Sequence, residues 1–162
     1  MAGVLACLAQ GACDGETPLA YEPPGAVLRA PVAQPRVVLD GTCTVAGDFW
    51  KANFYRWHHV DLRMGGTHYS QEEQLDILRA NPDGNGLVAL AQQLISARLN
   101  IASGVPPVGM DDALTSADTL IGALVVPPRG TDHLPTSETT TITESLAAFN
   151  EGRVGPGACT AK

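Results

Sequence analysis

The stretch "LVALAQQLISARLNIA", residues 87–102, constrains how the rest of this chain packs. Its apolar residues recur at the spacing of a helix but cover more than one helix face. They are Leu87, Leu90, Ala91, Leu94, Ile95, Ala97 and Ile101, with Arg98 as the charged exception. A helix that is apolar on so much of its circumference belongs in the interior, so we predict a domain built around residues 87–102.

A β-hairpin and a capped helix precede this central helix. The run from Val60 to Tyr69 alternates apolar and polar residues around two adjacent glycines, a pattern typical of a hairpin. Ser70 and Glu73 then form a capping box, in which the hydroxyl accepts from the Glu73 amide and the carboxylate accepts from the Ser70 amide. A helix therefore begins directly after the hairpin, and it stops before "NPDGNG", residues 81–86.

Two more helices follow the central one. The first begins near Met110, has apolar residues three and four positions apart, and stops at Pro127-Pro128. The last runs from a Ser137 cap to Gly152. We therefore predict a mainly α fold, a compact bundle of about four helices with one small β-hairpin.

The charge of the chain excludes some classes of partner. Acidic residues outnumber basic ones by 17 to 10 among the 162 residues, so the formal net charge is −7. Nucleic acid is not an expected partner, because binding it depends on basic side chains that neutralise phosphates, and no cluster of Lys and Arg offsets the acidic excess. Anionic membrane surfaces are disfavoured for the same reason.

The N-terminal part resembles the end of an export signal followed by a linker. Residues 1–13 form an apolar run rich in small residues but lack a basic segment before it, so we predict part of a longer signal peptide. Cys7 in "VLAC" and Cys13 in "GAC" are candidate lipidation sites of a bacterial lipoprotein. Residues 14–41 carry repeated prolines and predict an extended spacer. The alternative for residues 1–13 is a short N-terminal helix with two incidental thiols.

Two further cysteines lie near the ends of the predicted helical domain, residues 42–160. In an oxidising compartment, Cys43 and Cys159 predict a disulfide that joins these ends. Closing so long a loop stabilises a fold by about 4–5 kcal/mol in the chain-entropy model. In the cytosol the same pair would be two free thiols, so the export and disulfide predictions support each other.

The stretch "GDFWKANFYRWHH", residues 47–59, holds both tryptophans of the chain. Trp50, Phe54 and Trp57 are spaced four and three apart, which predicts one face of a helical turn. Such a stripe is more often core than ligand platform, although an exposed stripe would suit stacking on a polysaccharide. Trp50, Lys51, Asn53 and Trp57 are the candidate ligand or partner residues.

The histidines around the predicted hairpin form a weak candidate metal cluster. Its members are His58, His59, Asp61 and His68. Adjacent histidines on an extended segment face opposite ways, so only one of the first two could join His68. The sequence contains no H-E-x-x-H motif and no cysteine pair at zinc spacing. We predict no metal site and no cofactor, and keep a small metal-dependent hydrolase as the alternative function.

Blocks spread over residues 43–159 resemble a known module. They are Cys43, Gly47, Phe49, Trp50, Lys51, Asn53 and Trp57, the two glycines of the hairpin with Tyr69, "LDIL", "GNGLVALAQQLISARLNIASG" and "FNEGRVGPGAC". In this order they are similar to the Gly-Tyr/Phe-Trp-Lys-Asn-His module of bacterial exported and surface proteins. The chain departs from that motif where Ala52 is inserted and where Phe54 replaces the histidine. The resemblance implies an exported compartment and an architecture, and no defined reaction.

These observations predict a non-catalytic module that is exported or tethered at the cell surface. Its role is structural, or it recognises a cell-envelope protein or polysaccharide. Contact with a membrane is expected only through an N-terminal lipid anchor.

Overall fold

The computed structural model of this chain describes residue 39 and residues 41–57 and 62–160. All of them lie in one unit, Pro35–Lys162. The elements of the described part are α1 (Gly47–Ala52), the 3₁₀ turn η1 (Phe54–Arg56), β1 (Leu62–Met64), β2 (Thr67–Tyr69), α2 (Gln71–Arg79), α3 (Gly86–Ala102), α4 (Asp111–Ile121) and α5 (Thr136–Asn150). No helix among these has the length and apolar character that crossing a bilayer requires.

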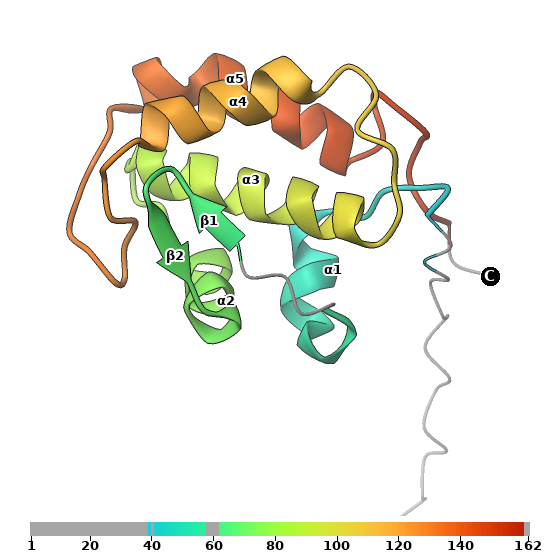
Figure 1. Cartoon of the computed structure of the whole chain (residues 1–162), viewed down its shortest axis with the longest axis horizontal. Helices are drawn as coiled ribbons and strands as arrows, with labels where there is room; N and C mark the ends of the chain where they lie inside the picture. Colours follow the sequence, from blue (N-terminus) through green and yellow to red (C-terminus); the bar gives the residue numbers. More distant parts are fainter. Residues whose placement is uncertain (1–38, 40, 58–61, 161–162) are drawn as a thin grey trace, which may run out of the picture. The chain divides into compact units, whose positions relative to one another are not determined.

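Helix α3 lies in the middle of the domain, as its apolar circumference predicts. Its N-cap is Asn85, whose side chain accepts a hydrogen bond from the Leu87 amide at 2.9 Å. Figure 1 shows α3 between two layers, one made of α4 and α5 and the other of α1, α2 and the hairpin. Leu90, Leu94 and Ile95 have no exposed surface. The predicted mainly α fold with one β-hairpin is confirmed.

The hairpin and the start of α2 agree with their local sequence signals. Strands β1 and β2 pair antiparallel, with Leu62 opposite Tyr69. These two side chains are buried, whereas His68 on the other face of the hairpin is exposed. The capping box is present, with the Ser70 amide 2.7 Å from the Glu73 carboxylate and the Glu73 amide 3.2 Å from the Ser70 hydroxyl. Local hydrogen-bonding rules therefore predict this segment correctly.

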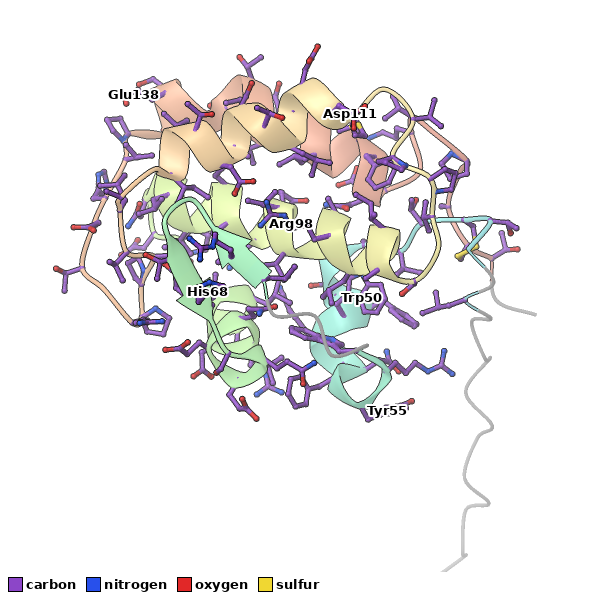
Figure 2. All side chains as sticks on the ribbon, in the orientation of Figure 1. Trp50, Tyr55, His68, Arg98, Asp111 and Glu138 are labelled. Atoms are coloured by element: carbon purple, nitrogen blue, oxygen red, sulfur yellow. A yellow bond between two sulfur atoms is a disulfide. The ribbon has the colours of Figure 1, made fainter. Side chains whose placement is uncertain are left out.

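Arg98, the charged exception in α3, fastens the hairpin to α3 and α4. One guanidinium nitrogen donates to the main-chain carbonyl of Arg63, and the other forms an ion pair with Asp118. The second carboxylate oxygen of Asp118 accepts the Gly65 amide at 3.0 Å. In Figure 2 the Arg98 side chain lies between the α3 ribbon and helices α4 and α5. One charge on the apolar helix thus joins three elements.

Helix α4 ends earlier than predicted, at Ile121 rather than at Pro127-Pro128. Gly122 follows with φ +51°, a left-handed conformation that glycine adopts at little cost. Its carbonyl then accepts the Gly66 amide of the hairpin turn at 2.6 Å. A Cβ atom on Gly65 would lie 2.2 Å from that carbonyl oxygen. This close approach between distant turns, and not the prolines, ends the helix.

The predicted number of about four helices omitted α1. This helix has six residues, and the aromatic spacing in this stretch predicts only a helical turn and not a separate helix. With it, the described part of the chain has five α-helices. The last of them begins at Thr136 after Pro135, so the predicted Ser137 cap is wrong by two positions.

The two ends of the domain are joined as predicted. Cys43 and Cys159 form a disulfide across 116 residues, with 4.9 Å between their Cα atoms. Main-chain hydrogen bonds flank it, because the Thr44 amide donates to the Gly157 carbonyl at 2.8 Å and the Cys159 amide donates to the Thr44 carbonyl at 2.9 Å. The disulfide therefore reinforces an isolated strand pairing that already holds the ends together.

Candidate functional site

The tryptophans of the aromatic stretch lie in the core. Trp50 has no exposed surface and Trp57 is 7% exposed. The Trp57 indole nitrogen donates to the Trp50 carbonyl at 3.1 Å. The helix ends at Ala52, and Asn53 separates it from η1, so Trp50 and Trp57 do not share a helix face as their spacing predicts. Neither ring forms an exposed platform for a sugar.

The other two candidate residues of this stretch hold local structure. The Lys51 ammonium pairs with Asp48 at 3.0 Å. The Asn53 amide donates to the Phe49 carbonyl at 2.8 Å and so caps the end of α1, and its oxygen accepts from the Tyr55 hydroxyl at 3.1 Å. Tyr55 is 78% exposed. These contacts account for Lys51 and Asn53 without a ligand.

A small polar hollow of about 160 Å³ lies beside α1. It is lined by Ala46, Gly47, Asp48, Lys51, Leu78, Gln92, Gln93, Ser96, Asn150 and Glu151. Several lining groups are already hydrogen-bonded inside the protein: the Ser96 hydroxyl donates to the Gln92 carbonyl at 2.8 Å, and the Asn150 amide donates to the Gln93 carbonyl at 3.0 Å. A hollow of this size has room for about five water molecules, which is little for an organic ligand.

Two buried asparagines position the aromatic segment. Neither is among the candidate site residues that the sequence predicts. The Asn100 side chain accepts the Val45 amide at 3.0 Å and donates to the Val45 carbonyl at 2.9 Å, as a neighbouring strand would. It also donates to the Asn150 side chain at 3.2 Å. Both asparagines are 1% exposed. A buried polar side chain needs hydrogen-bond partners, which Asn100 and Asn150 find in each other and in the main chain.

The weak metal candidates are mostly outside the described residues. This applies to His58, His59 and Asp61, and likewise to the lipidation candidates Cys7 and Cys13. His68 is exposed on β2, where its ring lies against the Arg63 guanidinium. Within residues 41–57 and 62–160, no group of three or more His, Cys, Asp or Glu side chains is placed to hold a metal ion.

A larger, apolar groove lies between α4 and α5. It encloses about 720 Å³, within the range of known ligand sites. Its lining residues are Val108, Gly109, Met110, Asp112, Ala113, Ser116, Thr141, Ile142, Glu144, Ser145, Ala148 and Val154. Val108 and Val154 are 70% and 45% exposed, and in the described part only Tyr55 is another exposed large apolar side chain. Exposed apolar surface is therefore concentrated at this groove.

The groove has acidic side chains and no basic one among its described lining residues. Asp112 and Glu144 contribute carboxylates to the lining. Helices α4 and α5 together contain five acidic residues and no Lys or Arg: Asp111, Asp112, Asp118, Glu138 and Glu144. In Figure 2 Asp111 and Glu138 stand at opposite ends of this pair of helices. Asp118 is paired with Arg98 of α3, so the negative local field over the groove comes from the lining carboxylates of Asp112 and Glu144.

The lining of the groove contains two serines and, among its described residues, no histidine or lysine. Ser116 and Ser145 are its two serines, and the Ser145 hydroxyl donates to the Thr141 carbonyl at 2.9 Å. A serine nucleophile needs an adjacent base, which the histidine-free and lysine-free lining described here does not supply. Sequence reasoning missed this groove, although Val154 among glycines and Val108 after two prolines are apolar residues outside any predicted core face.

Comparison with known proteins adds no relative to these observations. The resemblance to the Gly-Tyr/Phe-Trp-Lys-Asn-His module stays a prediction. No family model, no curated protein and no solved structure matches this chain.

Proposed function

We propose that this chain is an exported module, tethered at the cell surface, that recognises a partner of the cell envelope and does not catalyse a reaction. The observation that carries the proposal is the disulfide between Cys43 and Cys159. Disulfides persist in oxidising compartments outside the cytosol and are rare inside it. A bridge that closes nearly the whole domain is therefore expected of an exported protein.

The tether is supported by the N-terminal sequence. Residues 1–13 have the apolar, small-residue character of a signal segment, and residues 14–41 have the composition of a spacer. A lipid on Cys7 or Cys13 would anchor the module, and the spacer would hold it away from the membrane. Residues 1–13 and nearly all of the spacer, residues 14–38 and 40, lie outside the described residues.

Recognition is supported by the contrast between two sets of side chains. Trp50 and Trp57 are used in the core, whereas Val108 and Val154 are exposed at the groove between α4 and α5. Concentrated exposed apolar surface is typical of interaction sites in soluble domains. A protein partner therefore fits this groove better than a polysaccharide, which would stack on aromatic rings that the described lining residues do not include.

The experiment that tests this proposal is intact-mass measurement of the protein from the membrane and secreted fractions of its native cells. The sample is alkylated with and without prior reduction. We expect a lipid-modified N-terminal cysteine and one disulfide, seen as two alkylation sites that appear only after reduction. Replacing Cys7 or Cys13 by serine shows which one carries the lipid. Retention of Met1 with four alkylatable thiols before reduction would contradict the proposal.

A further inference from the structure

We propose that the groove between α4 and α5 binds a cationic amphipathic segment of a partner protein, with apolar side chains in the groove and Lys or Arg side chains beside Asp112 and Glu144. This inference rests on the proposed recognition function and names the chemistry of the partner.

The apolar part of the partner follows from what the groove exposes. Met110, Ala113, Ile142 and Ala148 contribute apolar atoms to its lining, and Val108 and Val154 add exposed side chains. Covering such surface is favourable by about 25 cal/mol per Å² of apolar area removed from water. A volume of about 720 Å³ accommodates several aliphatic side chains rather than one. The 11 residues of α4 extend about 16 Å, the length of about three turns of a partner helix.

The cationic part follows from the charges around the groove. Asp112 and Glu144 belong to the lining, and no Lys or Arg occurs in either helix. The nearest basic residue in the sequence, Arg153 beside Val154, is paired with Glu151 at 2.8 Å. Unlike Asp112 in the first turn of α4, Glu144 lies in the middle of α5, so a helix dipole does not account for it. Basic side chains on a partner would complement both carboxylates.

Other occupants fit these observations less well. A second copy of this chain would bring acidic α4 and α5 surfaces together, and the whole chain carries a net charge of −7. A polysaccharide would stack on aromatic rings, whereas none is among the described lining residues. Tyr55, the exposed aromatic side chain, lies on the side of the domain away from α4 and α5 in Figure 2. An anionic lipid surface would be repelled.

The test uses two synthetic helical peptides of about twelve residues. Both carry leucines at i, i+3, i+4 and i+7, and the remaining positions are lysine in one peptide and glutamate in the other. Binding to the full-length disulfide-bonded protein is followed by ¹H–¹⁵N NMR. We expect the lysine peptide to shift amides of Val108, Ala113, Ile142 and Ala148. The glutamate peptide should bind roughly tenfold more weakly or worse, and added salt should reduce this difference.

Variants locate the interaction. D112N combined with E144Q should weaken the lysine peptide by about fivefold to tenfold, since two charge pairs are removed. The matched control is E72Q combined with D76N, two exposed acids on α2, which should leave the affinity unchanged. V108S combined with V154S should weaken both peptides, because it removes apolar contact and leaves the charges in place.

Each outcome decides for or against the inference. The inference would be overturned if the E72Q/D76N control and the D112N/E144Q variant lost the same affinity for the lysine peptide. It would also be overturned if millimolar lysine peptide shifted no amides of α4 and α5. A dimer in sedimentation that dissociates with V108S and V154S would show a second copy as the occupant and would also overturn it. The proposed function is tested separately by the mass measurement, in which free thiols and an unprocessed N-terminus would contradict it. The failure of the inference and the failure of the proposed function are therefore distinguishable.

Discussion

The aromatic segment at residues 47–57 and the groove between α4 and α5 are opposite in character. The first is dense in large rings, yet Trp50 and Trp57 are buried. The second has no aromatic ring among its described lining residues, yet its aliphatic side chains Val108 and Val154 are exposed. The number of large rings in a segment therefore does not show which side chains reach the surface, and the exposed aliphatic side chains mark the groove for which we propose a partner.

The largest expected effect is in the buried aromatic segment. W50A removes a fully buried indole and should lower the free energy of unfolding by about 3–5 kcal/mol, because the cavity cannot collapse completely. Urea denaturation followed by circular dichroism measures the change. A loss below about 1 kcal/mol would show that Trp50 is not part of a close-packed core, and the contrast with the groove would then break down.

The next largest loss of unfolding free energy is expected in the polar network that holds this segment to α3 and α5. N100L leaves the Val45 amide and carbonyl without their side-chain partner and should cost about 2–4 kcal/mol, because unsatisfied buried polar groups are expensive. The control is N81L at an exposed turn, which should cost much less. Equal losses of unfolding free energy in the two variants would contradict a stabilising role for the network.

A smaller change in unfolding free energy is expected from the difference between the two tryptophans. Trp57 donates its indole N–H to the Trp50 carbonyl, whereas the Trp50 indole nitrogen is buried without a hydrogen-bond partner in the described structure. W57F therefore loses a hydrogen bond that W50F does not. Once the different cavity volumes are allowed for, W57F should lower the free energy of unfolding by about 1 kcal/mol more than W50F does. Thermal and urea unfolding of both variants measure this difference. A larger cost for W50F would mean that packing outweighs hydrogen bonding here.

The smallest effect on stability is expected in the groove. V108S should change the free energy of unfolding by less than about 0.5 kcal/mol, because Val108 is mostly exposed. Its matched control, V88S, alters a buried valine of α3 and should cost about 2–3 kcal/mol. Denaturation of both variants under one set of conditions gives the comparison. Strong destabilisation by V108S would show that the groove is a packed part of the fold and not a free surface.

Local patterns predict much of this fold. Periods of two and of three to four residues locate the hairpin and the long helices, and the capping box at Ser70 and Glu73 marks the start of α2. The all-round apolar character of residues 87–102 places α3 at the centre. Pairing of Cys43 with Cys159 follows from their positions near the two ends of the domain.

The candidate site is less predictable because its features depend on distant contacts. The break after Ala52 moves Trp57 away from the helix face that its spacing from Trp50 predicts. Gly122 ends α4 where its carbonyl meets the hairpin turn, a contact that crosses more than fifty residues. Val108 and Val154 become neighbours of one groove only after α4 and α5 pack together.

The sequence by itself determined the helical class, the hairpin, the central helix and the pairing of Cys43 with Cys159, because each depends on local periodicity, a capping interaction or the small number of cysteines. Only the tertiary structure decided which apolar side chains are buried. Burial depends on the neighbours that packing supplies, and these come from segments far apart in the chain. For this reason Trp50 belongs to the core, whereas Val108 remains exposed.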